Sequence, residues 1–65
     1  MIKTVIKLKN DTVMVFDVRG EQMEVYQGEY DAVRRKILED APPDAVFLYW
    51  VGSKAIPETV SREEW

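Results

Sequence analysis

The sequence predicts an α+β domain, in which an antiparallel β-meander carries one helix packed on one face. Two observations favour this class. Apolar residues alternate with polar residues over much of residues 2–27, which is the period of strands with a buried face. At Gly28 the period changes to the 3.6-residue repeat of an amphipathic helix. The expected element order is βββαβ, and a short fifth strand could follow at the edge of the sheet.

Three strands are expected before the helix. Residues 2–8 alternate β-branched and polar positions, and residues 12–18 are apolar on both parities, as is typical of a central strand covered on both faces. Asn10 and Asp11 tolerate positive φ and therefore predict a hairpin turn between these strands. Gly20 supplies the conformational freedom for a second turn. Residues 21–27 are then expected to form the third strand.

The helix follows from a stripe of apolar residues. Tyr30, Val33, Ile37 and Ala41 recur at helical spacing, so they share one face of a helix. The Pro-Pro pair at 42–43 ends it, because proline cannot donate to the helical hydrogen-bond ladder and restricts the residue before it.

Five features are expected after the helix. Residues 45–51 predict a central fourth strand because they are apolar on both faces, and residues 52–54 predict a turn. Pro57 limits residues 55–60 to the sheet edge or to an irregular segment. Ser61 and Glu64 match the spacing of a capping box. Trp65 is interpreted as a buried anchor that holds the tail, because docking a large apolar side chain would stop a terminus from fraying.

The composition limits the kinds of catalytic and metal-binding sites that the chain can form. Sixty-five residues suffice for a single domain over 1–65, with a thin stability margin. The sequence contains no Cys and no His, so disulfides, zinc sites and the usual nucleophilic dyads and triads are excluded. The acidic pairs Asp40 with Asp44 and Glu63 with Glu64 lack the spacing of a calcium loop and are interpreted as solvated surface. We therefore expect no enzyme activity, no cofactor and no metal.

The location is predicted to be cytoplasmic. The longest nearly apolar run, residues 45–51, is far shorter than the roughly 20 residues of a spanning helix, so no membrane association is expected. The first residues lack the features of a signal peptide. A formal net charge of −3 favours solubility and slightly disfavours generic attraction to nucleic acid.

One helix can cover only one face of a sheet, so the second face needs an explanation. The helix is expected to cover the parity that holds Ile2, Ile6, Leu8, Met14, Phe16, Val18, Met23 and Val25. The opposite face would then expose an apolar patch, which monomers rarely leave open. Two explanations stay open: the tail residues Ile56, Val60 and Trp65 fold over this face, or a second copy or another protein covers it. The residues assigned to this candidate interaction face are Val5, Val13, Val15, Tyr26 and Trp50.

A second functional hypothesis concerns nucleic acid. Lys3, Lys7 and Lys9 share one parity of the first strand, and Tyr26 and Trp50 could lie on the same face. Basic residues with exposed aromatics can stack single-stranded RNA. The simpler interpretation is that lysines on an edge strand prevent unwanted strand pairing, and the acidic net charge favours it. Binding of nucleic acid is therefore the alternative to a protein-interaction or homo-oligomerising module.

Two segments carry a resemblance to known proteins. They are residues 26–44, which contain the helix and the Pro-Pro pair, and the closing residues 60–65 (Val-Ser-Arg-Glu-Glu-Trp). Together they resemble small uncharacterised bacterial proteins of unknown function. The resemblance implies a stand-alone bacterial protein and assigns no activity.

Overall fold

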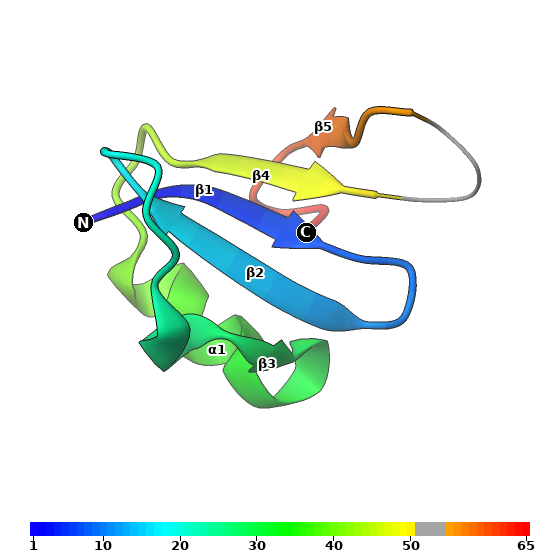
Figure 1. The fold of residues 1–65 in the computed structure, drawn as a ribbon, viewed down its shortest axis with the longest axis horizontal. Coiled ribbons are helices and arrows are strands. Elements are labelled where there is room, and N and C mark those ends of the chain that lie inside the picture. Colours follow the sequence, from blue (N-terminus) through cyan, green and yellow to red (C-terminus); the bar gives the residue numbers. More distant parts are fainter. Residues whose placement is uncertain (51–54) are drawn as a thin grey trace.

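The computed structural model describes residues 1–50 and 55–65. In these ranges a mixed five-stranded sheet, in the order β3-β2-β1-β4-β5, packs against one α-helix (Figure 1). The α+β class predicted from the sequence is therefore confirmed. The predicted turn at residues 52–54, and the last residue of the predicted fourth strand, lie outside the described residues. The elements are β1 (Ile2–Lys7), β2 (Thr12–Asp17), the 3-10 helix η1 (Glu24–Tyr26), β3 (Gly28–Glu29), α1 (Tyr30–Asp40), β4 (Val46–Tyr49) and β5 (Glu58–Val60).

The two predicted turns form, each as a three-residue loop. Between β1 and β2 the Leu8 amide donates to the Thr12 carbonyl at 2.8 Å, and Asp11 has a φ of 64°. After β2 the Asp17 amide donates to the Glu21 carbonyl at 2.9 Å. Gly20 takes the left-handed position there with a φ of 83°, as this class of loop requires. The first loop is one residue longer than the predicted two-residue turn.

The predicted third strand over residues 21–27 is wrong. Gln22 makes a single bridge to Phe16, and the Met23 amide donates to the Val15 carbonyl at 2.7 Å. The chain then turns through η1 and rejoins the sheet only in the two residues of β3. The alternation of Met23 and Val25 with polar residues predicts a strand. Val25 is instead 63% exposed, because the chain leaves the edge of the sheet here and forms η1.

The sheet is not an antiparallel meander, because β1 and β4 pair in parallel. The helix α1 carries the chain from β3 at one edge across the sheet to the other side of β1. Parallel neighbours need a crossover of this kind, usually a helix. The predicted helix itself is confirmed, and Pro42 follows its last turn, where the Ala41 amide donates to the Ile37 carbonyl at 2.8 Å. β5 pairs with β4 at the edge, as predicted for the segment after Pro57.

The core lies between α1 and the odd-numbered positions of the central strands. Val5 pairs with Val15 on β2 and with Phe47 on β4, so the three side chains project to the same face of the sheet. Val5 and Val15 are 0% exposed. The predicted choice of faces is therefore reversed for these strand positions: α1 covers them, and not Ile6 and Met14. Ile2 and Met23, also predicted on the covered parity, do belong to the core or pack against it. The buried apolar side chains are Ile2, Val5, Val13, Val15, Ile37, Ala41, Phe47 and Trp65.

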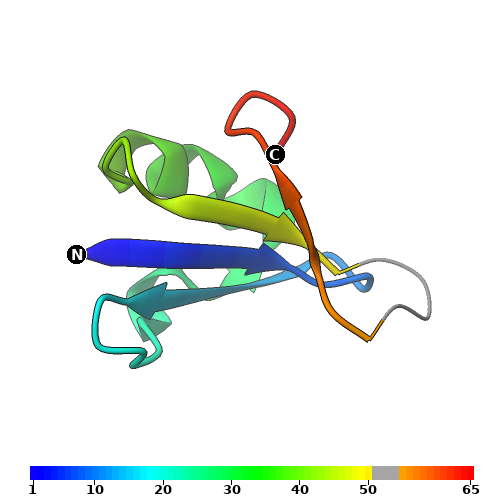
Figure 2. The same ribbon diagram turned by 90° about the horizontal axis from the view of Figure 1, so that it is seen from above.

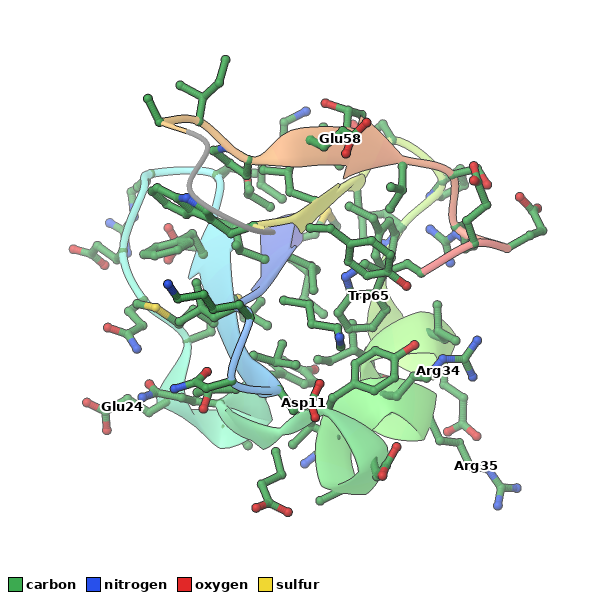
Figure 3. The ribbon with its side chains drawn as sticks, turned by 90° about the vertical axis from the view of Figure 1, so that its right-hand side faces the viewer. Asp11, Glu24, Arg34, Arg35, Glu58 and Trp65 are labelled. Carbon is green, nitrogen blue, oxygen red and sulfur yellow. The ribbon has the colours of Figure 1, made fainter. Side chains whose placement is uncertain are left out.

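Trp65 closes this core, as expected of a buried anchor. Its side chain is 0% exposed, and its ring lies 5.1 Å from the rings of Tyr30 and Phe47, centroid to centroid (Figure 3). The indole N–H donates to the Leu48 carbonyl at 3.3 Å. The C-terminal segment lies on the same side of the strands as α1 (Figure 2). The tail therefore does not cover the second face: Trp65 and Val60 pack into the core, and Ile56 is 74% exposed.

Arg62 fastens the tail to the end of the helix. Its guanidinium donates to the carbonyls of Leu38 at 3.3 Å, Ala41 at 3.2 Å and Pro42, and it lies 5.2 Å from the ring centroid of Phe47. A cation at this position satisfies free carbonyls and complements the negative end of the helix dipole.

The predicted capping box also forms in the tail. The Ser61 amide donates to the Glu64 carboxylate at 3.3 Å, and the Glu64 amide donates to the Ser61 hydroxyl at 3.2 Å. These reciprocal bonds hold the single turn that directs Trp65 back toward the sheet. The predicted role of Ser61 and Glu64 is therefore confirmed.

The buried anchor predicts a large effect of truncating Trp65. Trp65→Ala should lower the free energy of unfolding by about 3–5 kcal/mol, because it removes a large side chain that no rearrangement can replace. Ile56→Ala is the matched control and should change it by less than about 0.5 kcal/mol, since Ile56 is exposed. Urea unfolding followed by circular dichroism measures both. Equal effects would show that Trp65 does not anchor the core.

Candidate functional site

The candidate site is the face of the sheet that α1 leaves uncovered, made by Thr4, Ile6, Met14, Phe16, Val46 and Leu48. The pairing register sets these side chains in two rows. Ile6 pairs with Met14 on one side and with Leu48 on the other, and Leu48 pairs with Thr59 at the edge. Thr4 lies in the same way between Phe16 and Val46. Directly paired residues project to the same face, so the six side chains form one continuous surface across β2, β1 and β4.

This surface is separate from the core. The partly buried apolar side chains that pack against the core include Met23, Tyr26, Tyr30, Val33, Leu38, Ala45, Tyr49 and Val60. The apolar side chains of the uncovered face are not among them, although each is partly buried. We attribute their partial burial to shielding by their neighbours on the sheet. Among the described elements, the helix and the C-terminal segment both lie on the opposite side (Figure 2).

The uncovered face is also uncharged. Its six residues are apolar or carry a hydroxyl, and Thr59 continues the first row as a further polar but neutral side chain. None of these seven described side chains is ionisable, so the surface is an uncharged one. Its chemistry is that of an apolar contact with polar edges.

Four of the five predicted interaction residues do not lie on this face. Val5, Val13 and Val15 are 0% exposed under α1, so their assignment to an open surface is wrong. Tyr26 lies on η1, where its hydroxyl donates to the Asp40 carboxylate at 2.6 Å. Trp50 continues the even-numbered positions of β4 beyond Leu48, and its amide donates to the Lys7 carbonyl at 2.9 Å, so its predicted place on this face stays a prediction. The error has one physical cause: β2 is apolar on both parities, so its sequence cannot tell which parity faces the helix.

The three lysines of the nucleic-acid hypothesis are dispersed. Lys3 lies 3.9 Å from Asp44 at one end of β1, and Lys9 is exposed in the loop beyond the other end. Lys7 lies on the helix side, where its ammonium is 3.0 Å from the Asp11 carboxylate. It also lies 5.0 and 5.2 Å from the ring centroids of Tyr30 and Tyr49, respectively. The structure therefore does not bring the lysines together with Tyr26 and Trp50 on one face.

A polar cluster around the Trp65 carbonyl is the feature that sequence reasoning missed. The Tyr30 hydroxyl donates to this carbonyl, and the Arg34 Nε lies 2.9 Å from that hydroxyl. The Tyr49 hydroxyl lies 3.1 Å from the same carbonyl and 2.7 Å from that of Glu64 (Figure 3 labels Arg34 and Trp65). Burial, followed by the hydrogen bond with Tyr30, raises the pKa of Tyr49 above its ordinary value. The cluster holds the tail and belongs to the fold.

The described residues show no arrangement for metal chemistry and no membrane-spanning helix. Within residues 1–50 and 55–65, no three acidic side chains gather closely enough to hold a metal ion. None of the helices in these ranges has the length and apolar character needed to cross a bilayer. The uncovered sheet face therefore remains the surface that calls for an explanation.

The raised pKa of Tyr49 predicts a loss of stability in alkali. A folded-state pKa above the ordinary tyrosine value of 10.0 favours the neutral phenol, so the contribution of this phenol to stability is present below about pH 10 and is lost as the pH rises through the folded pKa. The Tyr49→Phe variant should lose less stability between pH 9 and pH 11.5 than the wild type, as measured by urea unfolding. An equal loss in both proteins would contradict this role for Tyr49.

Comparison with known proteins assigns no function to this chain, so its function is argued from the geometry of the structure. No protein-family model, no curated protein and no solved structure matches this chain. The resemblance to small bacterial proteins therefore stays a prediction, and a function is argued below from the uncovered face.

Proposed function

We propose that this chain is a non-catalytic module that associates with a second copy of itself through the uncovered face. The observation that supports the proposal is the continuous neutral surface around Ile6, with Met14 and Leu48 on its two sides. Association would cover this surface as α1 covers the other face, and would give the sheet a second apolar layer.

A second copy fits this surface better than a charged partner does. No side chain of the uncovered face carries a charge, so two copies can approach without burying an unpaired ion. Neutral threonines at positions 4 and 59 interrupt and border the apolar residues, and they can accept water or hydrogen bonds at the rim. A nucleic acid would require the basic side chains that the structure places elsewhere.

The size of the protein limits how strongly two copies can associate through this face. The protein measures 29 × 23 Å in the two directions across its shortest axis, the view of Figure 1. An ellipse of these dimensions, which is the cross-section of the whole protein, covers about 500 Å², so a face on one side of the protein falls short of the roughly 800 Å² that each partner buries in a standard interface. We therefore expect a weak dimer, with a dissociation constant on the order of micromolar or larger.

Association would also add stability to a domain whose small core provides little. A chain of 65 residues buries only about 60% of the surface that its unfolded form exposes. Domains of this size commonly gain stability from disulfides, metals or oligomerisation, and the sequence has no Cys and no His for the first two of these in their usual form. Dimerisation would then couple the stability of the fold to protein concentration.

The proposal predicts that a charge on the uncovered face disrupts association. At several hundred micromolar the wild type should approach twice its 7.6 kDa mass in sedimentation velocity, and Met14→Glu should remain a folded monomer. Val25→Glu is the matched control, because Val25 is exposed on η1 away from this face, and it should dimerise like the wild type. A wild type that stays monomeric at every accessible concentration would overturn the proposal.

A further inference from the structure

We draw no further inference here: the strongest candidate, the polar cluster around the Trp65 carbonyl between the start of α1 and the end of β4, belongs to the fold, because the Tyr30, Tyr49 and Arg34 donors that form it already bond to that carbonyl.

Discussion

A sheet has two faces, and the part of this chain that the structure describes supplies one α-helix to cover them. All of the fully buried core gathers where α1 meets Val5, Val13 and Val15, and Phe47 extends that core on β4. Because β1 and β2 are also apolar on their other parity, covering one face leaves a second apolar surface. The parallel pairing of β1 with β4 adds Val46 and Leu48 to that surface and makes it continuous. The proposed function follows from this single imbalance between strands and helices.

The C-terminal tail reinforces the covered face and does nothing for the open one. Trp65 packs between Tyr30 and Phe47, and Arg62 binds the free carbonyls at the end of α1. These contacts join the last residues to both the helix and β4, so the core is closed at the edge where β5 is short. A tail committed to this role does not shield Ile6 and Leu48, and the proposed function assigns their cover to a second copy.

Local chemistry predicted the helix, the two turns and the capping box, because each depends on residues close together in sequence. The burial of Trp65 was predicted from the size and apolar character of its side chain, although its contacts with Tyr30 and Phe47 are distant in sequence. The strand order was not predictable in the same way, since the parallel pairing depends on where α1 returns the chain. The choice of the covered face failed for a related reason. Val13 and Val15 are as apolar as Met14 and Phe16, so a period of two gives no sign of which pair faces the helix. Packing with Ile37 and Trp65 in the core determines which parity of β2 faces the helix. Lys7 shows that polarity at a strand position can also mislead, because its ammonium lies on the helix side near the rings of Tyr30 and Tyr49.

The central claim is that the face opposite α1 is the surface of association. Methyl-resolved NMR over a concentration series tests it most directly, because it reports on both faces in one sample. The account predicts that the methyl signals of Ile6, Met14 and Leu48 shift with protein concentration, while those of Val5, Val15 and Ile37 in the core stay constant. Shifts confined to other surfaces, or no shift up to millimolar concentration, would contradict it.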